Sequence, residues 1–440
     1  MSGVSCGRPQ KANMNAEGAS RHPKVLIISQ GAPGVGNDAN SIMLWRLLQH
    51  FPMNSYIVLS SSRNWPDGWV PQARQEEGYR CFVGYAIRLG MSRSGVGTSS
   101  VVHSTHSARR ILKDWLERSV KSILRGIMDP LSVVVQTWSA AVTATAVIEN
   151  EDITSILAIS DNGPCFTAGW IAHWRTGIPL DLFIFDLWRE NVFRWFPRLM
   201  ASLFQQPILA ASRWVFSGGE GIGEYMSTKV GTKSVVVRNS IVACGVTLVG
   251  SQSGSPMVVV YTGGVYWAQL DVILDMVVAV RDMVGIEFQV YSRQSVDQLA
   301  VLGVTGTNVV LRQGLSEDEI RERQVAADVL YLPMSFGERG RHIIETAQPA
   351  KSVEYMASGV PILIHAPAYA FVTRYAREHD IAIVVDQPGP EELTRVLTAL
   401  ISDRTDAQRK AARAAELASK SYDSLKISYL LQSYLLHERV

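Results

Sequence analysis

The chain has 440 residues, of which 47% are hydrophobic and 19% are charged, and its formal net charge is +2. This length is more than one ordinary hydrophobic core supports, so two domains are expected, and the balanced charge argues against a general nucleic-acid-binding protein, which would carry a strong basic excess. The four cysteines are widely spaced, which argues against a disulfide framework or a zinc site and fits the reducing cytoplasm.

The first half of the chain begins with a polar segment and continues as alternating strands and helices. Residues 1–23 lack the apolar core of a signal peptide and are expected to form a flexible tail. The Gly-rich turn GAPGVGN, at 31–37, separates the first expected strand from an amphipathic helix. Short apolar runs predict buried strands at 24–29, 55–61, 155–160, 180–186 and 234–240. Such alternation predicts a parallel sheet with helices on both faces.

Two neighbouring segments of this half raise the question of a membrane. Residues 131–148, LSVVVQTWSAAVTATAVI, carry no charge and predict either a short membrane-spanning helix or, as we favour, a buried helix of a large domain. Residues 108–128 repeat apolar side chains at helical spacing, and basic residues outnumber acidic ones there. A basic amphipathic helix predicts peripheral contact with an anionic membrane surface. The alternative is an ordinary helix packed on the sheet with a solvated basic face.

The strand–helix pattern restarts after a small, polar stretch at 241–255, which we take as the linker. Expected strands of the second half cover residues 256–264, 286–293, 307–314, 327–334, 360–366 and 381–387. The predicted domains are an N-terminal one at 24–243 and a C-terminal one at 244–400, followed by helices at 401–440 that are expected to pack back toward the N-terminal domain. Two doubly wound domains in tandem leave a cleft between them, and ligands bind there at the carboxyl ends of the strands.

One segment of the C-terminal half, AQPAKSVEYMASGVPILI at 347–364, carries a candidate anion site. Its pattern predicts a helix at 350–358 that starts behind a proline and ends at Gly359. The first amides of a helix favour an anion, and a lysine in the first turn, Lys351, is unfavourable unless an anion binds there. Glu354, one turn further on, suits the hydroxyls of a sugar. The alternative is an exposed Lys–Glu pair on a surface helix.

The sequence PAKSVEYMASGVPIL resembles the nucleotide-sugar site of the retaining GT-B glycosyltransferases of the family 4 type. The segments AADVLYLPMS and VVLRQGLSEDEI also match, and in the first half MDPLSVVVQTW, SILAISDNGPCFTAGWIAHWRTGIPLDLFIFDLW and RNSI stand in the family order. The resemblance covers about residues 24–400.

This resemblance implies an α/β protein of the GT-B fold, in which two Rossmann-like, doubly wound domains face a central cleft. It implies transfer of a sugar from a nucleoside diphosphate sugar to a glycan or lipid-linked acceptor, with retention of configuration and without a metal or other cofactor. Such an enzyme would act in cell-envelope or exopolysaccharide assembly, in the cytoplasm or at the inner face of the membrane.

The resemblance also implies roles for individual residues of the C-terminal domain. Glu354 would bind the donor ribose, and Lys351 would hold the diphosphate together with helix amides. The glycines of YTGGVY would let backbone approach the phosphates; the alternative is a plain turn at a strand end. Arg293 would add charge, unless it is an ordinary surface arginine. The implied donor site comprises Gly263, Gly264, Arg293, Gln313, Gly314, Lys351, Ser352, Val353 and Glu354.

Further residues are implied for catalysis and for the acceptor side. Asp161 and Asp186 each follow an expected buried strand, so they would point into the cleft, where a carboxylate binds sugar hydroxyls or acts as a base. The alternatives are a helix cap for Asp161 and a buried structural role for Asp186. The implied catalytic residues are Lys351, Asp161, Asp186 and Glu345, and the implied loop toward the acceptor or the transferred sugar contains Gly34 and Gly36.

The sequence departs from the family pattern in several places. Many members carry two glutamates separated by seven residues; the second matches Glu354, but the first falls on Thr346, with Glu345 beside it and Glu338 as another candidate. The helix after YTGGVY lacks the usual basic pair, having no Lys or Arg before Arg281, and a histidine common in the N-terminal cleft is absent. These departures keep two alternatives open: a sugar-nucleotide epimerase of the same fold, and a non-catalytic partner subunit that retains the nucleotide site.

Overall fold

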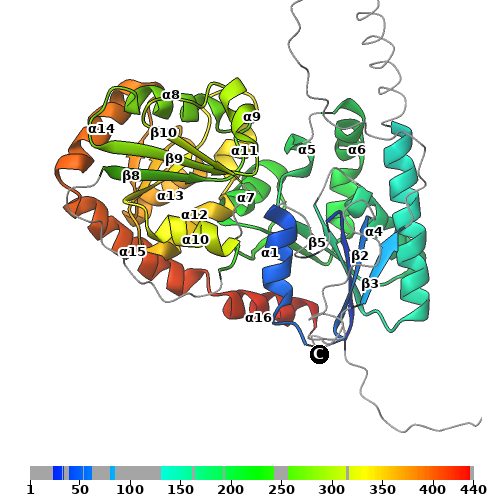
Figure 1. The fold of residues 1–440 in the computed structure, drawn as a ribbon. Helices are drawn as coiled ribbons and strands as arrows, with labels where there is room; N and C mark the ends of the chain where they lie inside the picture. The colour runs from blue at the N-terminus through cyan, green and yellow to red at the C-terminus, as the bar shows by residue number, and fades with distance from the viewer. Residues whose placement is uncertain are drawn as a thin grey trace, which may run out of the picture.

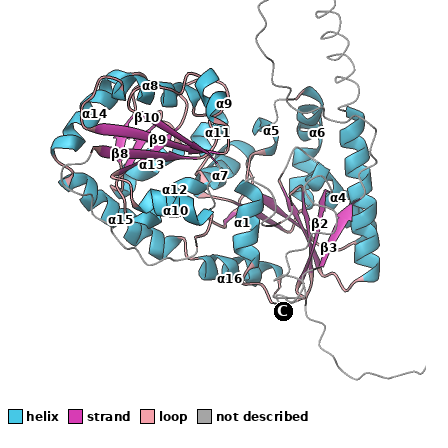
Figure 2. Ribbon diagram, viewed as in Figure 1, coloured by secondary structure: helices cyan, strands magenta, loops and turns pink. Residues whose placement is uncertain are grey.

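The computed structural model describes two domains, each built around one parallel sheet (Figure 1). The strands of each sheet lie between helices (Figure 2), as the alternation of strands and helices in the sequence predicts. The described residues are 23–31, 33, 39–52, 54–61, 80–84, 130–160, 164–191, 194–241, 256–313 and 317–436.

The N-terminal sheet has the strand order β3-β2-β1-β4-β5-β6-β7, with every neighbouring pair parallel. All residues of β1, β4 and β5 are buried, because helices cover both faces of the sheet. Its strands are β1 (Val25–Ser29), β2 (Tyr56–Ser61), β3 (Arg80–Gly84), β4 (Ser155–Ile159), β5 (Leu180–Ile184), β6 (Trp214–Ser217) and β7 (Val235–Val236).

The predicted strands of this half are all present, but two further ones were not predicted. β3 (RCFVG) and β6 (WVFS) lack the continuous aliphatic runs that mark the predicted strands. The strand expected at 234–240 is reduced to the two residues of β7 at the sheet edge.

Helices cover the two faces of the N-terminal sheet in separate groups. One core cluster joins the sheet to the helix Pro130–Asn150 and to α4 and α6, and another joins the opposite face to α1 and α16. The helices and helical turns of this domain are α1 (Ala39–Leu48), Pro130–Asn150, α4 (Pro164–Thr176), α5 (Trp188–Asn191), α6 (Trp195–Ala211), α7 (Glu220–Tyr225) and the π-helical turn η2 (Met226–Val230).

The helix Pro130–Asn150 differs from the buried helix that its composition predicts. Ala144, Val147 and Ile148 pack into the core, yet only 17% of its most apolar window is buried, so the expectation of a buried helix is wrong for most of its length. Judged by length and composition only, it is the one helix among the described residues that is long and apolar enough to cross a membrane. The predicted amphipathic segment 108–128 lies outside the described residues.

The C-terminal sheet has the order β10-β9-β8-β11-β12-β13, again with parallel neighbours. All six strands predicted for this half are confirmed: β8 (Met257–Thr262), β9 (Ile286–Ser292), β10 (Val309–Gln313), β11 (Val329–Pro333), β12 (Ile362–His365) and β13 (Ile383–Val385). The order reverses between β8 and β11, and ligands of doubly wound sheets bind outside the strand ends at such a reversal. The helices are α8 (Leu270–Val280), α9 (Val296–Val301), α10 (Glu317–Val325), α11 (Arg341–Thr346), α12 (Ala350–Ser358), α13 (Phe371–His379) and α14 (Pro390–Ser402).

The last two helices contact different domains. α15 (Thr405–Ser421) packs on α12 of the C-terminal domain, whereas α16 (Ser424–Leu435) packs on α1. Ile427 and Leu431 of α16 belong to the N-terminal core, and Ser428 donates a hydrogen bond to the carbonyl of Leu47 at 2.7 Å. The chain end therefore joins the two domains (Figure 1).

Candidate functional site

The helix α12 begins and ends where the sequence predicts. It spans Ala350–Ser358, begins behind Pro349, and ends at Gly359, whose φ of +71° is the left-handed cap that glycine adopts readily. The amide of Ser352 donates to the carbonyl of Pro349 at 2.8 Å, so this amide is engaged within the first turn. The side chains of Ser352 and Val353 are both buried. A role for Val353 in holding a diphosphate therefore rests on its backbone, whereas Ser352 would have to give up the hydrogen bond to Pro349.

Lys351 lies directly against the turn that follows β8. Its Nζ donates to the Tyr261 hydroxyl at 3.0 Å and stands 4.3 Å from the centroid of that ring. Gly263 has a φ of +134°, and a Cβ built on it would be 2.5 Å from Nζ of Lys351. Any side chain there would displace the ammonium. Burial lowers the pKa of Lys351 from its ordinary value, and no carboxylate of the described residues forms an ion pair with it.

The turn that holds Gly263 and Gly264 is fixed by neighbouring polar side chains. The Tyr355 hydroxyl of α12 accepts from the amide of Thr262 at 3.0 Å. The Tyr261 hydroxyl donates to the carbonyl of Gly264 at 2.6 Å. On the far side, Gln294 bonds both the amide and the carbonyl of Val265, at 2.6 and 3.1 Å. α12 and the turn thus form one rigid unit.

Glu354 contacts the other domain. Its Oε1 accepts from Nη2 of Arg46 in α1 at 2.8 Å, and Nη1 of Arg46 donates to the carbonyl of Ser240 at 3.2 Å. The Glu354 side chain is one-third exposed and the Arg46 side chain less so, at 33% and 13%. The exposed surface of Glu354 leaves room for a further hydrogen-bonding partner.

Asp186 lies in the N-terminal domain, just after the carboxyl end of β5. Its carboxylate accepts from the side-chain amides of Asn40 at 3.4 Å and Asn191 at 3.2 Å. The Ser160 hydroxyl, after β4, accepts from the amide of Asp186 at 3.1 Å and fixes its backbone. The residue is exposed to solvent, but neighbouring protein atoms partly desolvate the carboxylate, and this desolvation raises the pKa of Asp186 above its ordinary value.

The domains touch where Glu345 lies. Glu345 of α11 is half-buried. Burial, and then the carboxylates of Glu190 and Glu345, raise the pKa of Tyr225 in α7 to about 12. The ring of Tyr225 is 5.9 Å from that of His342, also in α11. A Cβ at Gly221 would lie only 2.5 Å from a carbonyl oxygen of α11, so the two elements meet at backbone distance.

The remaining predicted site residues are less directly engaged. Arg293 and Gln313 are both exposed, and Nε2 of Gln313 donates to the carbonyl of Arg293 at 3.3 Å, so the structure brings them together at the ends of β9 and β10. In the sheet, β9 and β10 follow β8 on the side away from β11, and the Gly263 turn comes directly after β8. The predicted residues Gly34, Gly36, Asp161 and Gly314 lie outside the described residues.

The structure places an arginine against a tryptophan of the segment that follows the Gly263 turn, a contact that the sequence motif does not show. α8 carries no Lys or Arg, which agrees with the missing basic pair. Instead, the guanidinium of Arg339 lies 5.7 Å from the ring centroid of Trp267, just beyond the turn. Arg339 belongs to the loop between β11 and α11. Among the described residues, no three of His, Cys, Asp or Glu group together as metal ligands would.

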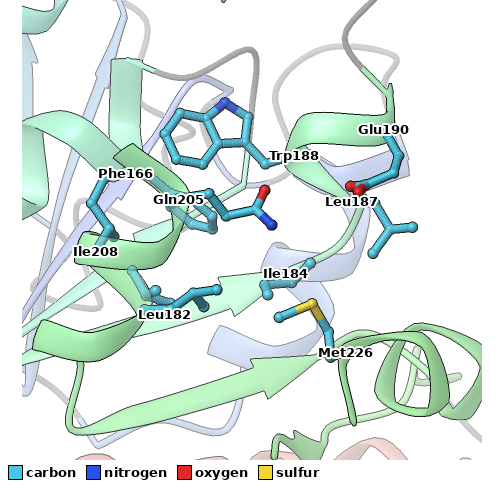
Figure 3. Close-up of a pocket in the computed structure, with 10 residues that line it drawn as sticks. Phe166, Leu182, Ile184, Leu187, Trp188, Glu190, Gln205, Ile208 and Met226 are labelled. Atoms are coloured by element: carbon cyan, nitrogen blue, oxygen red, sulfur yellow. The ribbon is translucent and has the colours of Figure 1, made fainter. Parts of the chain in front are cut away.

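A small, mostly apolar pocket lies between β5, α4, α5 and α6 in the N-terminal domain (Figure 3). Leu182 and Ile184 of β5, Phe166 of α4 and Ile208 of α6 line it, with Glu190 and Gln205 among its polar residues. Trp188 of α5 packs edge-on against Phe166, with 5.5 Å between the ring centroids. The pocket thus marks the packing of α5 against α4 and α6.

Several of these contacts could not be found from the motifs. Arg46, Tyr225 and Gln294 stand in no recognisable pattern and acquire their contacts only through the fold. Tyr355, by contrast, lies inside the KSVEYMAS segment and could have been included as a positioning residue.

The comparisons with known proteins establish the fold. No protein-family model and no curated protein matches the sequence. Among solved structures, sucrose-phosphate synthase from Thermosynechococcus elongatus matches with a TM-score of 0.63 and 12% identity, covering 94% of this chain and 98% of that one. Anabaena HepE, in complex with UDP-glucose, matches with a TM-score of 0.60 and 14% identity over 94% and 99% of the two chains.

A third structure widens the functional range of these neighbours. A putative UDP-N-acetylglucosamine 2-epimerase from Listeria monocytogenes matches with a TM-score of 0.55 and 14% identity, over 94% of this chain and 96% of that one. The chain has the GT-B fold. At such identities the similarity concerns the fold alone, which glycosyltransferases share with an epimerase.

Proposed function

We propose that this protein is a retaining glycosyltransferase that moves a sugar from a nucleoside diphosphate sugar to an acceptor. The observation that carries the proposal is the position of Lys351, whose ammonium lies against Gly263 one helical turn before Glu354. A cation beside uncovered backbone suits a diphosphate, and a partly exposed carboxylate one turn away suits ribose hydroxyls. The complex of a fold neighbour with UDP-glucose supports a nucleotide sugar as the donor.

In this mechanism the bond between the anomeric carbon and the diphosphate oxygen breaks, and an acceptor hydroxyl oxygen bonds to the same face of that carbon. The hydroxyl proton leaves with the diphosphate or a nearby base. Negative charge grows on the departing diphosphate, so Lys351 and the backbone of the Gly263 turn would contribute most by stabilising it. Arg339 would supply the second cation that α8 lacks. Asp186, in the N-terminal domain, would accept a hydrogen bond from a sugar hydroxyl.

The donor site is tested by thermal denaturation with a panel of nucleoside diphosphates and nucleotide sugars. A ligand that binds the native state must raise the melting temperature. We expect one nucleotide family to do so with the wild type and to lose the effect with Glu354→Ala. Transfer of sugar from that donor to candidate acceptors, followed by determination of the anomeric configuration, then tests the reaction. No shift with any nucleotide would contradict the proposal.

A sugar-nucleotide epimerase is the second candidate, and the fold similarity to a putative epimerase favours keeping it. An epimerase needs no separate acceptor. Incubating the donor with the protein alone therefore separates the two functions: an epimeric nucleotide sugar indicates the epimerase, whereas a product that forms only with acceptor indicates the transferase. The absence of a basic residue from α8 also keeps a non-catalytic partner subunit in view. Nucleotide binding without either reaction, together with copurification with an active homologue, would support that role.

A further inference from the structure

The helical layer on one face of the N-terminal sheet exposes large apolar side chains in rows. On the helix Pro130–Asn150, Leu131, Val134, Trp138 and Val142 are between 43% and 59% exposed and recur at helical spacing. They lie on the side of the helix away from the residues that pack into the core. Such a row would be an unusual surface to leave in water.

The neighbouring helices continue this surface. Trp195, Leu199 and Leu203 of α6 recur every fourth residue and are 61%, 44% and 56% exposed, and Trp174 at the end of α4 is 79% exposed. Helix Pro130–Asn150, α4 and α6 pack their opposite sides into one core cluster, which places all three on the same face of the sheet. We call the exposed side chains of these three helices the apolar face. All three tryptophans among the exposed large hydrophobic residues of the described chain belong to it.

The charged residues on these helices are two arginines, Arg175 and Arg198, and a single glutamate, Glu149, at the end of the first helix. The guanidinium of Arg175 lies 5.8 Å from the ring centroid of Trp138, so cationic and aromatic groups are interleaved. This composition is complementary to a surface that carries negative charge above an apolar layer.

Several hydroxyl groups on these helices are bonded to their own helix. The side chains of Thr143 and Thr145 donate to backbone carbonyls four residues earlier, both at 2.8 Å, and exposed Ser202 donates to the carbonyl of Arg198 at 2.9 Å. Hydroxyls satisfied by their own helix can enter a lipid interface at little cost, since no hydrogen bond to water is lost.

We infer that the apolar face docks the protein onto an anionic membrane surface, with the three helices lying at the interface between headgroups and acyl chains. Helix Pro130–Asn150 lies on the membrane rather than crossing it, because Ala144, Val147 and Ile148 keep its other side in the domain core. Tryptophan is enriched at membrane interfaces, and arginine can extend its charge to the headgroups while its stem stays apolar. This inference does not depend on the proposed glycosyl transfer.

The test is cosedimentation of the full chain with vesicles of equimolar phosphatidylcholine and phosphatidylglycerol, and with vesicles of phosphatidylcholine alone. We expect binding to the anionic vesicles that weakens as salt is added. The double variant Leu199→Glu/Leu203→Glu should lower the bound-to-free ratio at least about tenfold, since two apolar side chains leave the lipid and two anions face it. The matched control is Val284→Glu/Val301→Glu, at positions of the C-terminal domain that are 92% and 87% exposed; it should bind like the wild type.

Thermal unfolding by circular dichroism shows whether both double variants fold, and light scattering gives the mass of the wild type and variants. Failure of the wild type to bind anionic vesicles, or equal binding by the two double variants, would overturn the inference. So would a wild-type dimer that Leu199→Glu/Leu203→Glu dissociates without vesicle binding, because a second copy would then cover the face. A large loss of thermal stability in that variant, again without vesicle binding, would show that another part of the chain covers it.

Discussion

Arg46 and Glu354 are 308 positions apart in sequence, yet the guanidinium of one contacts the carboxylate of the other at 2.8 Å. The pair joins α1 of the N-terminal domain to α12 of the C-terminal domain. Arg46 is the more buried partner and is also held by the carbonyl of Ser240. The carboxylate proposed to bind ribose is therefore oriented by the domain that would bind the acceptor.

We expect Arg46→Ala to weaken binding of a nucleoside diphosphate about fivefold, equivalent to about 1 kcal/mol, because Glu354 loses the partner that fixes its orientation. Isothermal titration calorimetry measures this. The matched control is Arg374→Ala, which removes another ion pair between the domains, that of Arg374 with Glu224 at 2.9 Å, away from α12; it should leave nucleotide affinity unchanged. Tighter binding by Arg46→Ala would show instead that Arg46 competes with the ribose.

The role proposed for Glu354 can be tested with the ligand rather than the protein. A carboxylate that accepts a hydrogen bond from a ribose hydroxyl contributes about 1.5 to 3 kcal/mol. The wild type should therefore bind a ribonucleoside diphosphate at least about tenfold more tightly than its 2′-deoxy analogue. Glu354→Ala should bind both equally. If Glu354→Ala still bound the ribonucleoside diphosphate more tightly than the 2′-deoxy analogue, the ribose would bind elsewhere.

Gly263 is a position where a single methyl group should abolish donor binding. Alanine there would combine an unfavourable positive φ with a Cβ 2.5 Å from Nζ of Lys351, so either the turn or the ammonium must move. We expect Gly263→Ala to remove the thermal shift given by nucleotides. Gly177→Ala is the control, since Gly177 also has a positive φ, of +71°, but no atom near its Cβ position. It should cost about 1 kcal/mol of stability and leave nucleotide binding intact.

Tyr355 is proposed to position the Gly263 turn without touching the donor. Tyr355→Phe removes the acceptor of the Thr262 amide and should lower the free energy of unfolding by about 1 to 3 kcal/mol. It should also weaken nucleotide binding, because the turn is no longer fixed to α12. Tyr331→Phe removes an equally buried hydroxyl, bonded to the carbonyl of Val272 at 2.8 Å. If both variants lose stability and neither loses affinity, Tyr355 is structural only.

Much of this architecture could be predicted because its signals are local. Buried parallel strands appear as continuous apolar runs, and the bounds of α12 follow from Pro349 and Gly359 alone. The errors have physical causes as well. β6, with the sequence WVFS, lacks the aliphatic run that marks the predicted strands. The burial of helix Pro130–Asn150 depends on which elements pack against it, and composition alone does not reveal them.

The residues of the candidate site likewise divide into those with a local signal in the sequence and those without one. Lys351 and Glu354 could be identified because one helix places them at one end, whereas Arg46 and Tyr225 reach the cleft from elements far away in sequence. Such contacts leave no local signal in the sequence. They follow only from the packing of α1, α7 and α11 between the two sheets.

Lys351 gives a prediction about pH. Burial lowers the pKa of Lys351 in the folded protein. Between this lowered pKa and the ordinary value of about 10.4, the unfolded chain carries a proton on this amine that the folded chain lacks. The free energy of unfolding should therefore rise with pH across that interval because of this group, and Lys351→Met should remove that contribution in denaturant titrations.

Donor binding reverses this effect. The negative charge of a diphosphate favours the ammonium and raises the pKa of Lys351 again, so binding within that pH interval must take up a proton. Calorimetry in two buffers of different ionisation enthalpy measures the uptake directly, and affinity should fall as pH rises above the lowered pKa. In Lys351→Met this uptake should vanish along with much of the affinity. Wild-type binding with no proton uptake anywhere in the interval would mean that the diphosphate does not meet the amine of Lys351, and the donor would then lie elsewhere in the cleft.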